Sequence, residues 1–321
     1  TIGKKMTVCQ LYAKQIRHRG NVRYNTKNGR KRLMKLLEED KLGGCPIDSV
    51  KLSDAKEWAI RMKEKGISYK TISNDKRSLK AAFYTAIQDD CIRKNPFDFQ
   101  LNTVIEDDTE PKVPLTPAQE ESFLSFAQND KVYQKYYDEL IILLGTGLRI
   151  SELCGLTDTD INFENRIINV DHQLLRSAET GYYIETPKTK SGIRQIPMSE
   201  KVYEAFNRVL KRRRGAKAVT IDGYSNFLFL NRDGYPKTAT NYDGMFRGLA
   251  KKYNKYHEEA LPKVMTPHTL RHTFCTNMAN AGMNPKALQY IMGHSNITMT
   301  LNYYAHATFD SAKAEMLRIA A

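Results

Sequence analysis

Hydrophobic residues recur at helical spacing through the first hundred positions of the chain. Between residues 71 and about 90, for example, Ile72, Leu79 and Phe83 fall on one face of a helix. Ser68 stands just before this segment, where a side-chain oxygen can cap the start of a helix. The pattern predicts helices over residues 8–17, 26–39, 53–65 and 71–90.

The pattern changes after residue 94. Residues 95–114 are irregular and acidic and contain prolines near both ends, which is typical of a linker. Thr116 followed by Pro117 then indicates a helix start, and helices are expected to about Leu144. The next region predicts three short strands, at residues 166–170, 182–186 and 194–198. Helical patterning returns over residues 199–213, 238–253, 269–281, 285–292, 297–305 and 310–319.

These elements predict two domains in the chain of 321 residues, with a helical domain at 1–94, a linker at 95–114 and a second domain at 115–321. The expected fold class is mainly α with a small antiparallel β-sheet. No apolar run approaches the about 18 residues that cross a bilayer, and no signal peptide opens the chain. The five cysteines form no CxxC pair, which argues against disulfides and zinc. We therefore expect a cytoplasmic protein with reduced thiols and no membrane partner.

Positive charge is concentrated in the first domain. The net charge is +14, and residues 1–100 hold 23 Lys and Arg against 11 Asp and Glu, while the remaining residues hold 27 against 25. Such an excess is typical either of a solvated basic face or of a surface that binds phosphates. The candidate DNA-binding residues lie on two predicted helices and are Lys27, Arg30, Lys31, Lys35, Lys76, Arg77 and Lys80.

Two arginines of the second domain have neighbours that suit a phosphodiester. A guanidinium group binds two phosphate oxygens with a rigid fork. Arg149 follows Gly147, which permits a close backbone approach, and Glu152 is placed to pair with the arginine. Arg271 lies three positions after His268 and shares a helix face with it. Taken singly, such an arginine is more often part of a structural salt bridge.

The C-terminal part adds a histidine and two tyrosines. His294 follows Gly293 and precedes a predicted short helix that contains Tyr303 and Tyr304. Each piece alone has a structural explanation, as a cap neighbour or a core aromatic. The order of the pieces is more specific, because it runs arginine, lysine in a turn, His-x-x-Arg, Gly-His and tyrosine. This order resembles the tyrosine recombinase (phage integrase) family, and the C-terminal wording resembles integrases of conjugative transposons and Gram-positive phages.

The resemblance covers essentially the whole chain and implies a helical core-binding domain followed by a mixed α/β catalytic domain. In this family the lysine lies at the tip of a turn, which favours Lys190 over Lys188. The family's tyrosine follows the Gly-His histidine by nine or ten positions, which fits both Tyr303 and Tyr304, and the Ala-His that comes next favours Tyr304. The implied catalytic residues are Arg149, Lys190, His268, Arg271, His294 and Tyr304.

The resemblance also implies a reaction. Tyr304 attacks the scissile phosphate and forms a 3′-phosphotyrosyl bond, while Lys190 protonates the departing 5′-oxygen. His268 serves as base or hydrogen-bond partner of the phenol, His294 binds the phosphate, and the two arginines stabilise its charge. Because the phosphotyrosine keeps the bond energy, neither a metal nor another cofactor such as ATP is implied. A GxxxxGK[ST] loop is likewise missing from the sequence.

The implied partners are double-stranded DNA and further copies of the chain, which form a homotetramer on two DNA sites. Whether an accessory DNA-bending protein takes part stays open. The chain begins at Thr1 rather than Met, and whether a family-typical arm-binding domain precedes it stays open. The predicted helix at 310–319 is amphipathic and fits packing either on its own core or on a neighbouring subunit.

Three other functions compete with recombination. A type IB topoisomerase uses the same residue types but relaxes supercoils without exchanging partners, and the short first domain and the close Gly-His-to-Tyr spacing argue against it. A catalytically silent DNA-binding regulator is disfavoured because all six positions hold competent residues. A generic basic DNA-binding protein explains the charge of the first domain but not the ordered residues of the second.

Overall fold

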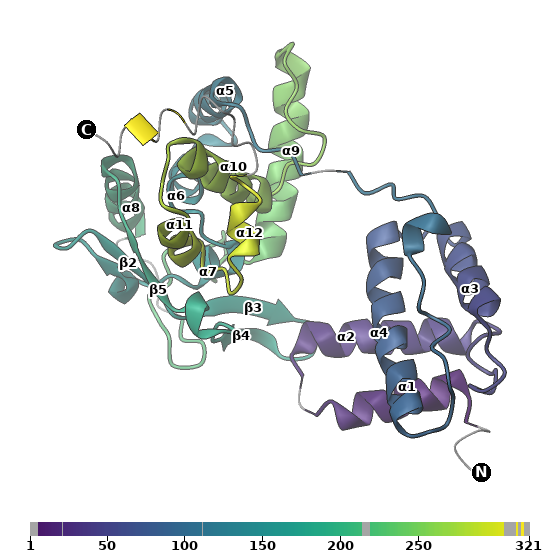
Figure 1. The fold of residues 1–321 in the computed structure, drawn as a ribbon. Coiled ribbons are helices and arrows are strands. Elements are labelled where there is room, and N and C mark those ends of the chain that lie inside the picture. The colour runs from purple at the N-terminus through teal and green to yellow at the C-terminus, as the bar shows by residue number, and fades with distance from the viewer. Residues whose placement is uncertain are drawn as a thin grey trace. The chain divides into compact units, whose positions relative to one another are not determined.

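A computed structural model describes residues 6–20, 22–110, 112–213, 219–304, 313, 316 and 317. The chain forms two compact units, residues 1–111 and 112–321, which can be followed in Figure 1. Each unit has its own hydrophobic core, as expected for a chain of this length. The elements are mainly helices with short antiparallel strands, which confirms the predicted fold class.

The first unit is built from helices around an aromatic centre. Ser68 caps the fourth helix as predicted, since its side chain accepts a hydrogen bond from the amide of Thr71. Trp58 and Phe83 are buried, and the ring of Phe97 packs on both, with centroids 5.8 and 5.3 Å away. Phe97 belongs to the predicted linker, whose first part therefore packs on this core. The helices are α1 (Val8–His18), α2 (Tyr24–Glu38), α3 (Leu52–Glu64) and α4 (Tyr69–Gln88).

The first helix of the second unit begins at the predicted position. Thr116 accepts a hydrogen bond from the amide of Gln119, and Pro117 occupies the first helical position. Its helices are α5 (Pro117–Asn129), α6 (Tyr137–Thr146), α7 (Ile150–Gly155), α8 (Glu200–Arg213), α9 (Ala239–Tyr256), α10 (Pro267–Asn280), α11 (Pro285–Met292) and α12 (Thr298–Leu301). The apolar helix α6 packs against α10, and α8 and α9 lie on opposite sides of this pair (Figure 1).

The strands form two small antiparallel sheets rather than one. The first has the order β1-β2-β5, and the second pairs β3 with β4. The three predicted strands correspond to β2 (Ile167–Val170), β4 (Gly181–Glu185) and β5 (Arg194–Pro197), whereas β1 (Ile161–Asn162) and β3 (Gln173–Ser177) escaped prediction. The turn that contains Lys190 therefore joins two sheets and is not the tip of a paired hairpin.

The C-terminal helices differ from the prediction in length. Within the range expected as a helix at 297–305, the structure has only the short helix α12, followed by a turn over residues 302–303, and residue 305 lies outside the described residues. The predicted helix at 310–319 lies, apart from three isolated positions, outside the described residues. In the described part of the chain, every helix is too short or too polar to cross a bilayer.

Candidate active site

Arg149 lies between two helices of the second unit. Helix α6 ends at Thr146, Gly147 adopts a left-handed backbone with φ 63°, and Arg149 is the N-cap of α7. Glu152 accepts hydrogen bonds from the backbone amide of Arg149 at 2.8 Å and from its Nη1 at 2.7 Å. Nη2 of Arg149 donates to the carbonyl of Gly293 at 3.0 Å. These bonds fix the arginine at the helix start while its side chain stays partly exposed.

Glu152 is the negative centre of an arginine cluster. Its buried carboxylate binds Arg149 and also Arg194, at 2.9 and 3.0 Å from the two terminal nitrogens of Arg194. Burial raises the pKa of Glu152, but the hydrogen bond from Arg194 and the charges of Arg194, Arg149 and Arg271 outweigh burial and lower the pKa to about 2. One carboxylate is thus hydrogen-bonded to Arg149 and Arg194 and lies in the field of Arg271. Three positive charges against one negative charge leave the cluster with an excess of positive charge.

Arg271 is buried on α10. Its Nη1 donates to the carbonyl of Gly147, and its Nη2 donates to the carbonyl of Met292 at 2.5 Å. Burial, together with repulsion by Arg149, lowers the pKa of Arg271 to about 9. The guanidinium is therefore still charged at neutral pH and is held by two uncharged acceptors.

Gly147 allows these helices to approach closely. A Cβ added at this position would lie 2.4 Å from Cδ1 of Phe274 and 2.9 Å from the sulfur of Met292. The left-handed φ of 63° also disfavours any other residue. Because the carbonyl of Gly147 binds Arg271, the glycine between α6 and α7 helps to place both arginines.

His294 follows Gly293, which ends α11 with a left-handed φ of 60°. The imidazole is buried, and its Nδ1 lies 3.0 Å from the hydroxyl oxygen of Thr300. Burial and the neighbouring arginines, Arg271 foremost, lower the pKa of His294 to about 4. The neutral imidazole has one donor and one acceptor nitrogen, so it can offer a hydrogen bond without adding charge.

His268 stands on the first turn of α10, and its side chain is exposed on one side. Partial burial on the other side, with the positive charges of Lys112 and Arg271, lowers the pKa of His268 to about 4. The imidazole is therefore neutral at neutral pH and has a nitrogen that can accept a proton. A negative phosphate placed among these cations raises this pKa by offsetting their repulsion.

The lysine-bearing turn lies beside the same elements. Lys190 is exposed and opens the short turn Lys190–Gly192 between β4 and β5. A Cβ added to Gly293 would lie 3.1 Å from the carbonyl oxygen of Ser191. The carbonyl of Gly192 accepts a hydrogen bond from Arg194 at 3.0 Å. The turn thus borders the end of α11, next to His294.

The two candidate tyrosines follow α12 and pack on a small apolar cluster of α10 and α11 residues. The hydroxyl of Tyr304 donates to the carbonyl of Met283 at 2.5 Å. The ring of Tyr303 packs on His272, with 4.8 Å between ring centroids. The hydroxyl of Tyr304 is therefore bound to the backbone between α10 and α11 and not to an arginine.

The predicted site residues are brought together to different degrees. Four of them form one cluster, in which the charges of Arg149 and Arg271 oppose each other and add to burial in lowering the pKa of His268 and of His294. The turn of Lys190 borders this cluster. Tyr304 lies in the same unit, and its hydroxyl donates a hydrogen bond to the carbonyl of Met283.

Known proteins match this arrangement. The model of the phage integrase family matches residues 114–311, which is more than half of the chain. The chain belongs to the phage integrase family. It is therefore a tyrosine recombinase, an enzyme that breaks and rejoins DNA in site-specific recombination.

Relatives of this integrase-family chain include transposon proteins. The transposase from transposon Tn916 of Enterococcus faecalis is 69% identical over 318 residues, which are 99% of this chain and 78% of that protein. The integrase of transposon Tn1549, solved in complex with a circular intermediate DNA, is 78% identical with a TM-score of 0.93, and the match covers 98% of this chain and 99% of that chain. A lambda integrase dimer bound to a core site is 16% identical with a TM-score of 0.62, covers 93% of this chain and 94% of that chain, and shares the fold.

Arg194 is the site residue that the sequence reasoning missed. Its side chain is completely buried and ends on Glu152. Alternation along β5 carried a usable signal, because Arg194 and Ile196 are buried while Gln195 and Pro197 are exposed. An arginine on the inward face of a strand needs a buried acceptor, and Glu152 provides it.

The basic residues predicted to bind DNA lie on α2 and α4 of the first unit. The four on α2 line one hollow together with apolar side chains, and they are Lys27, Arg30, Lys31 and Lys35. On α4, Lys80 pairs with Asp98 at 2.5 Å, Lys76 lies over the ring of Phe99, and Arg77 is exposed. The α2 set therefore surrounds a surface hollow, whereas two of the α4 cations contact their own unit.

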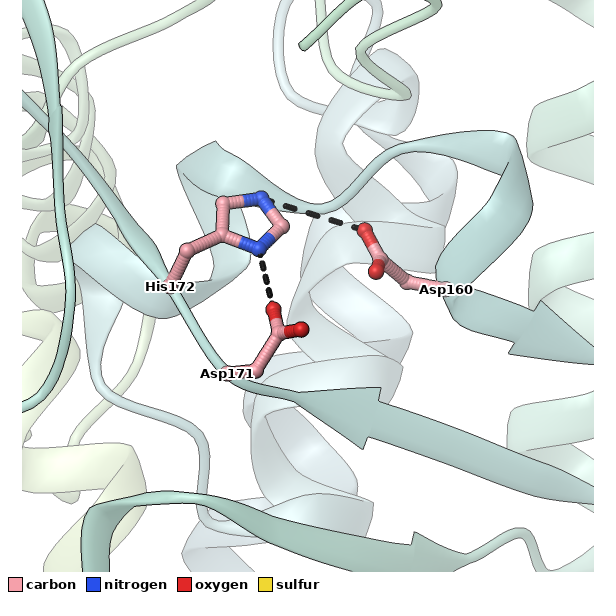
Figure 2. A group of neighbouring side chains, drawn as sticks. All are labelled: Asp160, Asp171 and His172. Carbon is pink, nitrogen blue, oxygen red and sulfur yellow. Dashed lines mark hydrogen bonds and ion pairs between the residues drawn. The ribbon is translucent and has the colours of Figure 1, made fainter. Parts of the chain in front are cut away.

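One group of side chains in this integrase-family chain has the composition of a metal site (Figure 2). Both ring nitrogens of His172 face acceptors, since Nδ1 lies 2.6 Å from Oδ1 of Asp171 and Nε2 lies 2.7 Å from the carbonyl of Gly155. Each ring nitrogen therefore already has a hydrogen-bond partner within the protein, and Nε2 also lies 3.9 Å from Oδ2 of Asp160. These contacts explain the group as a hydrogen-bonded cluster without a metal ion.

Proposed function

We propose that this chain is the integrase of a transposon and exchanges DNA strands at the ends of that element through a 3′-phosphotyrosyl intermediate formed by Tyr304. The observation that carries the proposal is the excess positive charge of the arginine cluster, flanked by two neutral histidines and a lysine-bearing turn. Relatives at 69 and 78% identity are a transposon transposase and a transposon integrase.

In the first step the phosphate binds Arg149 and Arg271. Two guanidinium groups offset the charge that develops on the non-bridging oxygens, in a place where little water competes. We assign the Thr300 hydroxyl as donor to Nδ1 of His294, 3.0 Å away, so that the hydrogen of the neutral ring is on Nε2 for a bond to the phosphate. His268 takes the phenol proton, and its pKa rises as the phosphate enters.

In the second step the Tyr304 oxygen forms a bond to phosphorus, and the bond from phosphorus to the 5′-oxygen breaks. Lys190 gives its proton to that oxygen, so a free 5′-hydroxyl leaves. A 5′-hydroxyl from a partner strand then attacks the phosphotyrosine, returning the bonding pair to the tyrosine oxygen. The number of phosphodiester bonds is unchanged, which is why no external energy source is needed.

The hydrogen bond from the Tyr304 hydroxyl to the carbonyl of Met283 must break before the tyrosine attacks. A single neutral hydrogen bond contributes about 0.5–1.5 kcal/mol, which DNA binding easily exceeds. Tyr303 is adjacent in the chain, so substitution of each tyrosine in turn distinguishes the nucleophile from its neighbour.

Double-stranded DNA is the partner we propose for both units. The Tn1549 integrase was solved with circular intermediate DNA and with transposon right end DNA. The hollow lined by Lys27, Arg30, Lys31 and Lys35 is the phosphate-binding surface that we assign to the first unit. Exchange between two duplexes needs several active sites, and a homotetramer on two DNA sites supplies them.

The proposed function is tested with labelled duplexes that carry the transposon end and a nick beside the cleavage position. The short fragment with the 5′-hydroxyl diffuses away after cleavage, so the covalent protein–DNA adduct accumulates and survives denaturant. A second duplex with a free 5′-hydroxyl should then yield a recombinant strand. Absence of the adduct overturns the covalent mechanism. Relaxation of supercoiled DNA without any recombinant indicates a type IB topoisomerase and overturns strand exchange.

The phosphate-binding role of the α2 surface predicts a change in salt dependence. Lys27→Ala with Arg30→Ala should weaken binding at low salt and reduce the slope of log affinity against log salt by about 1 for each phosphate that the variant no longer binds. Fluorescence anisotropy between about 50 and 200 mM salt measures this slope. The control pair Lys56→Ala with Lys65→Ala removes equal charge elsewhere on the unit. Equal slopes for both pairs contradict the role of the α2 surface.

A further inference from the structure

Arg194 is a buried guanidinium whose contacts join three separate segments. Its two terminal nitrogens donate to Glu152 at 3.0 and 2.9 Å, and the first also donates to the carbonyl of Gly192 at 3.0 Å. Its Nε donates to the carbonyl of Ile291 at 2.6 Å. None of the side chain is exposed to solvent. Arg194 therefore contacts protein groups only and has no access to DNA.

Each of the three acceptors belongs to a segment of the proposed active site. Glu152 is the same carboxylate that binds Arg149. Gly192 closes the turn that Lys190 opens. Ile291 stands near the end of α11, just before Gly293 and His294. One rigid side chain thus sets the distances among the phosphate arginine, the lysine turn and the histidine.

The geometry requires an arginine at this position. Three acceptors in different directions suit the planar fork, which has five donors at fixed angles, whereas lysine offers donors from a single nitrogen. Space is also tight, because a Cβ at Gly293 would lie 3.0 Å from Nη1 of Arg194 and 3.2 Å from its Cδ. The glycine before His294 therefore leaves room for the guanidinium group.

We infer that Arg194 is a positioning residue for the leaving-group step, which holds the turn of Lys190 at the distance from Arg149 and His294 that proton transfer requires. This inference rests on the proposed function, because it takes Lys190 as the acid for the 5′-oxygen. Pairing between β4 and β5 does not hold the turn in place, because these strands belong to different sheets. The bond from Arg194 to Gly192 ties the turn to α7.

The test compares two DNA substrates, one with an ordinary 5′-bridging oxygen and one with sulfur at that position. A thiolate leaves readily without a proton, since thiols have pKa values near 8.5. For Arg194→Lys we expect cleavage of ordinary DNA to slow by at least about tenfold, with the sulfur substrate restoring most of the rate and DNA affinity unchanged. General-acid contributions of about 10²–10⁴ set the upper limit.

The quantity compared is the cleavage rate of the sulfur substrate divided by that of the ordinary substrate. This ratio distinguishes a positioning role from a loss of stability, because a smaller folded fraction lowers both rates equally. Lys190→Ala is measured in parallel. The control is Arg166→Lys, because Arg166 forms an exposed ion pair with Glu200, and its ratio should stay at the wild-type value. If Arg194→Lys does not fold, Gly293→Ala crowds the guanidinium instead and should raise the same ratio.

The outcomes separate the inference from the function beneath it. Sulfur rescue of both Lys190→Ala and Arg194→Lys supports the inference. Rescue of Lys190→Ala with an unchanged ratio in Arg194→Lys and Gly293→Ala overturns the role of Arg194 and leaves the proposed function intact. No rescue of Lys190→Ala, with the wild-type adduct still forming, removes the general acid and overturns the inference with it.

Discussion

Tyr304→Phe should form no covalent adduct with nicked DNA under conditions in which the wild-type chain converts it. Phenylalanine keeps the ring on the apolar cluster of α10 and α11 but removes the oxygen that we propose forms the bond to phosphorus. DNA affinity should stay within about twofold, because the substitution removes one hydrogen bond to Met283 and leaves Arg149 and Arg271, which we propose bind the phosphate, in place. Denaturing gels of labelled DNA measure the adduct, and anisotropy measures the affinity.

Tyr303→Phe is the matched control and should keep the adduct. Burial and the neighbouring Cys275 raise the pKa of Tyr303 to about 12, although Arg271 lowers it. A phenol with so high a pKa is a poor nucleophile at neutral pH. Burial, and after it Cys275, also raise the pKa of Tyr304. An adduct that survives Tyr304→Phe and disappears in Tyr303→Phe would transfer the role to Tyr303.

Glu152→Gln should strongly destabilise the second unit. The amide keeps the shape of the side chain but leaves Arg149, Arg194 and Arg271 without their shared carboxylate. Removing one partner of a buried ion pair costs about 3–5 kcal/mol, because the remaining charge stays buried. Denaturant unfolding at pH 7 measures the difference. Glu200→Gln removes an exposed carboxylate paired with Arg166 and should change the free energy of unfolding by less than about 1 kcal/mol.

The pH dependence of this difference has a definite sign. The pKa of Glu152 is about 2 in the folded chain and 4.5 as its ordinary value. A lowered pKa contributes stability that is complete above about pH 4.5 and is lost as the pH falls toward 2. The gap between wild type and Glu152→Gln should therefore narrow between pH 5 and pH 3. A gap that stays constant over this range contradicts the assigned charge of Glu152.

Much of the helical fold could be predicted because its signals are local. Ser68 and the pair Thr116 and Pro117 mark helix starts by chemistry that acts within one turn. Strands β1 and β3 escaped because β1 has two residues and β3 lacks regular alternation of buried and exposed positions. Their pairing depends on partners elsewhere in the chain, which periodicity does not record.

The sequence predicted those parts of the candidate site whose residues lie at short, fixed distances along the chain. It did not predict contacts between residues that are brought together only by tertiary packing. Glu152 was expected to pair with Arg149, which stands only three positions before it in the chain. Arg194 is hydrogen-bonded to Glu152, from which it is separated by 42 positions in the sequence. No local pattern in the sequence indicates that these two residues are partners. The bond from Tyr304 to Met283 is likewise set by how α10, α11 and α12 pack.

The placement of β4 and β5 in different sheets has a consequence for motion. Within a paired hairpin, moving the tip distorts the ladder hydrogen bonds of both strands. Here the segment between Glu185 and Arg194 lies between two sheets, and the bond from Arg194 to the carbonyl of Gly192 holds its turn. Loss of that bond should let the turn that carries Lys190 move while the pairs β3-β4 and β2-β5 keep their register.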